Sequence, residues 1–68
     1  MSIVKVIEVI SEGKTIEEAL ESAVNEAGKT IENIKQVNVS HIEALVDKKK
    51  ITKIRLNVKI SFVVDHSK

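Results

Sequence analysis

Residues 51–64 read ITKIRLNVKISFVV and alternate between two kinds of side chain. One face is apolar or β-branched throughout, with Thr52, Ile54, Leu56, Val58, Ile60, Phe62 and Val64. The other face is polar except at its ends and carries Lys53, Arg55, Asn57, Lys59 and Ser61. This period of two predicts a β-strand with one face on a core and one facing water or a polar partner. The strand is longer than the usual run of about five or six residues, so we expect its overhang to contact other subunits.

Two other segments of the chain have strand character. Residues 3–10, IVKVIEVI, are rich in β-branched side chains and apolar on both faces, which indicates a strand covered on both sides. Residues 34–46 form a further extended segment, and residues 47–50 form the turn that leads into the long strand. The lysines of that turn, Lys48, Lys49 and Lys50, are interpreted as its solvated tip.

A helix is predicted from Thr15 to about Thr30. Thr15 and Glu18 have the spacing of a capping box, in which the threonine side chain caps the amide three residues later. One apolar stripe then follows at helical spacing, formed by Ile16, Ala19, Leu20, Ala23, Val24 and Ala27. Four of these six residues are alanine or valine, so the helix can lie close against a sheet.

The predicted order is β-α-β-β in a single domain spanning residues 1–68, and the fold class is α+β. A right-handed crossover through the helix makes the first two strands parallel, and the third returns antiparallel to its neighbour. One helix therefore covers one face of a three-stranded, antiparallel-type sheet.

The chain is short for a protein that folds alone. It has 68 residues, no cysteine and two histidines, which excludes disulfides, thiolate zinc sites and a histidine-built metal cage. Small chains without such supplements usually gain stability by oligomerisation. We therefore expect the chain to associate with copies of itself.

Composition argues against several classes of partner. Eleven basic and ten acidic residues, with a single aromatic, disfavour nucleic-acid binding. No apolar run approaches the roughly 20 residues that span a bilayer, and no leader segment is recognisable. A cytoplasmic protein without a membrane partner is the expectation.

No catalytic signature is present, and the chain is predicted not to be an enzyme. His41 could act as a base or ligand but is interpreted as a surface or interface histidine, while His66 is expected to be solvated. Arg55, the only arginine, suits binding of a carboxylate or phosphate; the alternative is an ion pair with a glutamate, across strands or between subunits. Glu43 and Asp47 are weak candidates for a cation site such as Ca²⁺, which symmetry could complete.

Four stretches of the chain resemble the dodecins: Val4–Glu8, Thr15–Leu20, Lys29–Ile34 and Val58–Phe62. The resemblance covers nearly the whole chain and implies a hollow homododecamer with helices outside and sheets lining the interior. It also implies a non-enzymatic protein that binds and buffers riboflavin or FMN.

The resemblance implies departures at the ligand site. Flavin-binding dodecins stack the flavin on a tryptophan at the position of Gln36 and place a glutamine at that of Arg55. Gln36, Asn38, His41 and Arg55 are the predicted ligand-binding residues, with flavin binding weakened or altered because a glutamine lacks an indole's stacking area. The chain looks closer to a tryptophan-less branch, in which one protein is described as calcium-binding. A carrier of flavin or an anionic ligand, a calcium- or other metal-binding shell and a purely structural assembly are the alternatives.

Overall fold

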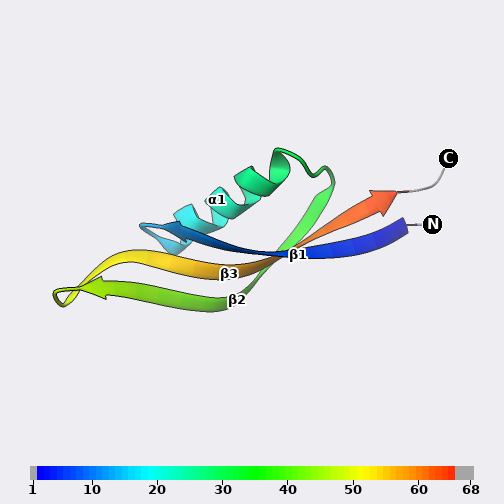
Figure 1. Cartoon of the computed structure of the whole chain (residues 1–68). Helices are drawn as coiled ribbons and strands as arrows, with labels where there is room; N and C mark the ends of the chain where they lie inside the picture. Colours follow the sequence, from blue (N-terminus) through cyan, green and yellow to red (C-terminus); the bar gives the residue numbers. More distant parts are fainter. Residues whose placement is uncertain (1, 66–68) are drawn as a thin grey trace.

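The computed structural model describes residues 2–65 and has the predicted β-α-β-β order (Figure 1). Its elements are β1 (Ser2–Gly13), α1 (Ile16–Gly28), β2 (Ile34–Asp47) and β3 (Lys50–Asp65). β1 continues three residues past the predicted Ile10. His66 lies outside the described residues.

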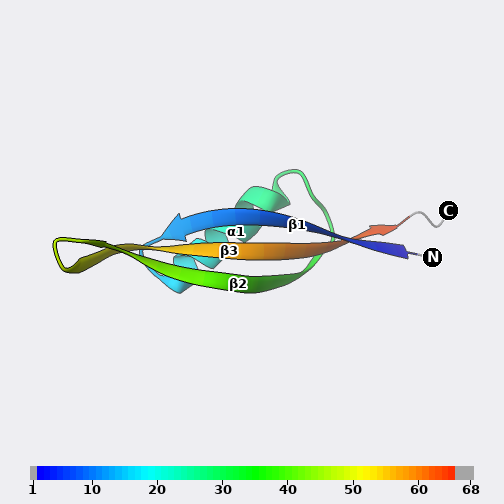
Figure 2. The same ribbon diagram turned by 60° about the horizontal axis from the view of Figure 1, so that its bottom comes forward.

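β3 is the central strand of a sheet with the order β1-β3-β2 and pairs antiparallel with both neighbours (Figure 2). β1 and β2 are therefore parallel edge strands, as the crossover rule predicts. Alternation is clearest in β3 because one of its faces is buried in the core and the other carries polar side chains. Its apolar face contains the three largest fully buried side chains, Leu56, Val58 and Ile60.

The helix covers one face of the sheet and packs on it through alanines. Thr15 caps α1 by accepting a hydrogen bond at Oγ1 from the Glu18 amide at 3.1 Å. Ala19, Ala23 and Ala27 are buried against the sheet. Small side chains at these positions let the helix backbone approach the sheet closely.

The hairpin of β2 and β3 extends well past the end of the helix (Figure 1). α1 has 13 residues while β2 has 14 and β3 has 16, and a strand rises about twice as far per residue as a helix. The molecule is consequently elongated, with extents of 56 × 19 × 13 Å. Lys48 and Lys49 form the turn with φ values of 53° and 68°, which confirms the predicted hairpin tip. The predicted overhang is present.

The second face of the sheet carries no helix, and we call it the helix-free face. The register of β1 on β3 places Val4, Val6 and Ile10 on it, opposite Val63, Ser61 and Asn57. These three β1 side chains are 62%, 55% and 66% exposed. The alternate β1 residues Ile7 and Val9 pack instead against the core below the helix. The chain therefore covers one of the two apolar faces of β1 and leaves the other bare.

Candidate functional site

A pocket of about 370 Å³ lies on the helix-free face and is lined by all three strands. β1 contributes Ile10, β2 contributes His41 and Glu43, and β3 contributes Arg55 and Asn57. The antiparallel register brings them together, since Asn57 lies opposite both Ile10 and His41. Arg55, the next β3 residue on this face, lies opposite Glu43 on one side and Glu12 on the other.

A β-bulge at Ser40 builds this pocket. The register of β2 on β3 shifts between Val39 and His41, so Val39 pairs with the buried Val58 while His41 pairs with Asn57. The extra residue reverses the alternation of side chains along the strand. Asn38 and His41, which regular alternation would place on opposite faces, consequently share the helix-free face. Ser40 fixes the bulge by donating its hydroxyl to the Asn57 carbonyl at 3.0 Å.

Arg55 is held between glutamates of the two edge strands. Its Nε donates to Oε2 of Glu12 at 2.9 Å, and its Nη2 lies 2.9 Å from the same oxygen. Its Nη1 lies 3.8 Å from Oε1 of Glu43. Lys53 donates its ammonium to the other oxygen of Glu12 at 3.0 Å. Two positive and two negative side chains therefore form one charge-balanced group.

This cluster lowers the pKa of Glu12 below its ordinary value of 4.5. The larger cause is the hydrogen bond from Lys53, followed by that from Arg55; both favour the ionised carboxylate. The folded state consequently binds a proton on Glu12 less readily than the unfolded state does. The stabilisation that this group supplies is present above pH 4.5 and is lost as the pH falls through the lowered pKa.

We therefore expect Glu12→Gln to lower the melting temperature at pH 7 by roughly 1–4 °C, because Glu12 is a partly exposed ion-pair partner. The difference from the wild type should vanish in acid below the lowered pKa. Thermal unfolding across pH 2.5–7, at one protein concentration, measures it. Glu32→Gln, at an exposed position between α1 and β2, is the control for charge removal. A difference that stays constant with pH contradicts the prediction.

The structure brings some of the predicted site residues together and separates others. His41 and Arg55 line the pocket, while Gln36 and Asn38 lie opposite Ser61 and Lys59, farther along the same face and outside the lining. All of the predicted β2 ligand residues are exposed in the single chain.

The two candidate metal ligands are separated along β2. Glu43 lies beside Arg55, whereas Asp47 pairs with Lys50 at the hairpin tip. Four residues of strand span about 13 Å, which is too far for both side chains to ligate one ion. Among the described residues, no three histidine, aspartate or glutamate side chains gather to hold a metal. A metal site would need carboxylates from several copies.

Three contributors to the site, Ile10, Glu12 and Asn57, were not among the predicted site residues. Glu12 was outside the predicted strand, and its role depends on the pairing of β1 with β3. Asn57 belongs to the polar face of the predicted long strand, so the face on which it lies could be predicted from the sequence. Its Oδ1 is buried without a hydrogen-bond partner among the described residues, which only the folded chain reveals.

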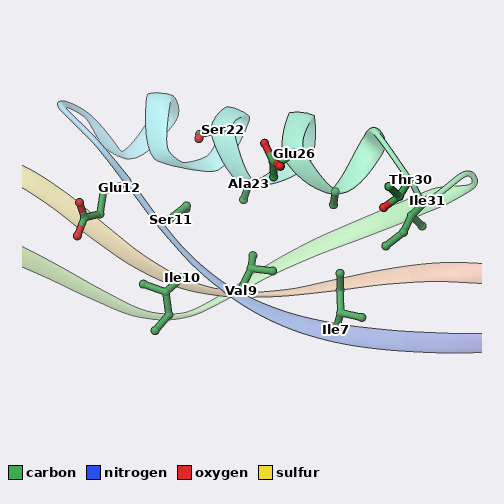
Figure 3. A pocket seen from close by; sticks show the side chains of 11 residues that line it. Ile7, Val9, Ile10, Ser11, Glu12, Ser22, Ala23, Glu26, Thr30 and Ile31 are labelled. Carbon is green, nitrogen blue, oxygen red and sulfur yellow. The ribbon is translucent and has the colours of Figure 1, made fainter.

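A separate groove of about 430 Å³ lies between α1 and the edge strand β1 (Figure 3). Ile7 and Val9 from the sheet and Ala23 from the helix face the groove from opposite sides and make its walls apolar, and Ser22 and Glu26 lie on the helix. The groove holds one acidic residue from each element, and within residues 2–65 no cluster of metal-binding side chains lies there.

A family model for dodecins matches residues 3–65. The chain belongs to the dodecin family. This family is non-enzymatic, comprises small ligand-binding proteins that include flavin binders, and forms homododecamers. No curated protein matches the chain. Within residues 2–65, no helix is long and apolar enough to cross a membrane.

Solved dodecin structures share the fold. A variant of the T. thermophilus dodecin superposes with a TM-score of 0.90 at 16% identity, covering 98% of this chain and 100% of that one. The dodecin of Streptomyces coelicolor gives 0.88 at 18% identity, with 97% and 96% covered. The calcium dodecin of Mycobacterium tuberculosis, described as a calcium-chelating antigen with a novel calcium-binding site, gives 0.79 at 25% identity, with 97% and 96% covered. The matches confirm the predicted family and leave its branch unassigned.

Proposed function

We propose that this protein forms a homododecamer that binds and stores a planar heteroaromatic ligand of the flavin class, without catalysis, in the pocket on the helix-free face. The observation that carries the proposal is a pocket that all three strands line, with Asn57 among its lining residues. Oδ1 of Asn57 is buried without a hydrogen-bond partner among the described residues, which costs free energy, and a rotation of this side chain toward the pocket would let a ligand N–H pair with it.

The pocket residues fit such a ligand. Its volume lies within the usual range for small-molecule sites, roughly 300–1,000 Å³. Ile10 offers an apolar surface, and the guanidinium plane of Arg55 is a group on which aromatic rings stack. No aromatic side chain lines the pocket, and Gln36, on the same face outside the lining, stands where flavin-binding dodecins carry a tryptophan. Binding weaker than that of a tryptophan-containing site follows from this.

The exposed apolar side chains of β1 also support the proposal. The bare face of β1 exposes Val4, Val6 and Ile10 in the single chain, and Ile10 is also a wall of the pocket. Copies that cover this face would therefore also close the pocket. We expect Gln36 and Asn38, on the same face, to contact a ligand held between copies.

Native mass spectrometry of protein purified without added ligand, followed by riboflavin titration monitored by fluorescence quenching, tests the proposal. We expect a dodecamer that binds riboflavin and an Asn57→Ala variant that binds it about tenfold more weakly, as loss of one hydrogen bond implies. Asn25→Ala on the exposed helix surface is the control. Equal affinity of Asn57→Ala and wild type, or no binding at all, contradicts the proposal.

The second candidate is a calcium-binding shell, favoured by the likeness to the M. tuberculosis calcium dodecin. Glu43 is the carboxylate best placed for it, because its side chain is 60% exposed and its contact with Arg55 is long. A melting temperature that rises with Ca²⁺ and falls with chelator, combined with absent riboflavin binding, would favour this candidate. Absence of both responses would leave a purely structural assembly.

A further inference from the structure

The only arginine of the chain is also the only positive side chain in the wall of the pocket. Its guanidinium has two nitrogens within 2.9 Å of Glu12 Oε2 and a third turned toward Glu43. A cation in this arrangement is not free to receive a phosphate or carboxylate. It already has an anion bound to it.

We infer that Glu12 is a resident counter-anion that occupies Arg55 and so excludes anionic ligands from the pocket, which takes uncharged ones. The inference rests on the proposed function and names the charge class of its ligand. Glu12 is a specificity-determining residue in this scheme: it acts through Arg55 and does not line the pocket itself.

The charges that face Arg55 favour this assignment. Glu12 comes from β1 and Glu43 from β2, while Lys53 on β3 is itself bound to Glu12. An entering anion would have to displace Glu12 from both cations or add a third negative charge to a balanced group. Either route opposes its binding, because like charges repel and the resident carboxylate already makes charge-assisted hydrogen bonds.

Stability alone is a weak reason for this arrangement. Arg55 and Glu12 are 40% and 36% exposed, and exposed ion pairs contribute little to folding. Their geometry is specific nevertheless, since one carboxylate binds two cations through separate oxygens. Control over which ligand reaches Arg55 is an effect that such a pair can exert without being buried.

Chemical labelling of Arg55 tests the inference, because the chain contains no second arginine. The assembled protein is treated with phenylglyoxal, with and without inorganic pyrophosphate, and modification is followed by mass spectrometry. We expect wild type to react slowly at a rate that pyrophosphate does not change. Glu12→Gln should react at least threefold faster and should be protected severalfold by pyrophosphate. Glu32→Gln, at an exposed position between α1 and β2 and with the same change in net charge, should behave like wild type.

Two results would overturn the inference. One is equal labelling of wild type and Glu12→Gln, and the other is pyrophosphate protection of wild type as strong as that of the variant. Riboflavin titration of the same preparations separates this inference from the proposed function. Absent riboflavin binding beside the expected labelling pattern would refute the proposed ligand class while Glu12 still excluded anions from Arg55.

Discussion

Gly13→Ala is expected to destabilise the protein by about 1–3 kcal/mol, the usual cost of overpacking a tightly packed site. A Cβ atom at Gly13 would lie 2.7 Å from the Ala19 amide nitrogen, 2.9 Å from Glu18 Cβ and 3.0 Å from the Glu18 carbonyl carbon. Two of these three atoms belong to the helix backbone, which cannot move aside as a flexible side chain can. The first turns of α1 would have to shift away from the end of β1.

That shift would also break a hydrogen bond at the same junction. Ser11, two residues earlier on β1, donates its hydroxyl to the Ala19 carbonyl at 2.8 Å and so ties the strand to the helix. A 68-residue protein is stabilised by only a few kcal/mol in total, about 0.05–0.15 kcal/mol per residue. Overpacking at Gly13 together with loss of the Ser11–Ala19 hydrogen bond would therefore remove a large part of the stability. The helix cap at Thr15 would be displaced by the same shift.

Gly28→Ala is the matched control. No heavy atom lies within 4 Å of a Cβ built there, and its φ is not positive. Alanine should therefore be tolerated and should stabilise the last helical turn by about 0.5 kcal/mol. Urea unfolding followed by circular dichroism at one protein concentration compares the variants. A Gly13→Ala midpoint equal to that of wild type contradicts the close approach of strand and helix.

Local chemistry was sufficient to predict the elements and the fold class. The capping box at Thr15, the alanine-rich stripe and the alternation of residues 51–64 each determine one element, and the crossover rule then fixes the relative directions of the strands. The end of β1 was missed because Ser11, Glu12 and Gly13 are poor strand formers by composition. Pairing with β3 extends the strand through them, and such pairing is a long-range interaction that a local pattern does not contain.

The site was harder to predict for a related reason. His41 and Arg55 were identified as candidates, but the bulge at Ser40 decides which β2 side chains share their face, and no residue type marks that bulge in the sequence. The residue that pairs with Arg55 could not be identified from the sequence either. A glutamate partner was one of the two interpretations of this arginine, but the choice of Glu12 depends on the register between β1 and β3.

Val6→Lys is expected to prevent formation of the dodecamer, weakening association by tenfold or more at each interface. Val6 lies on the helix-free face of β1 between Val4 and Glu8, and over half of its side chain is exposed in the single chain. An exposed apolar row on a short chain marks a surface that a partner covers. A buried lysine there has no acidic residue directly opposite it, because Val6 pairs with Ser61.

Symmetry makes this effect large, because one substitution is repeated in all copies and is present at each equivalent interface. Analytical ultracentrifugation and native mass spectrometry should show small species in place of the dodecamer, with a lower melting temperature because oligomer formation stabilises the fold. Asn25→Lys, on the exposed helix surface, is the control for one added positive charge. An intact Val6→Lys dodecamer would mean that this row faces the interior solvent. The pocket beside Ile10 would then be open to the cavity, and its closure by neighbouring copies would have to be abandoned.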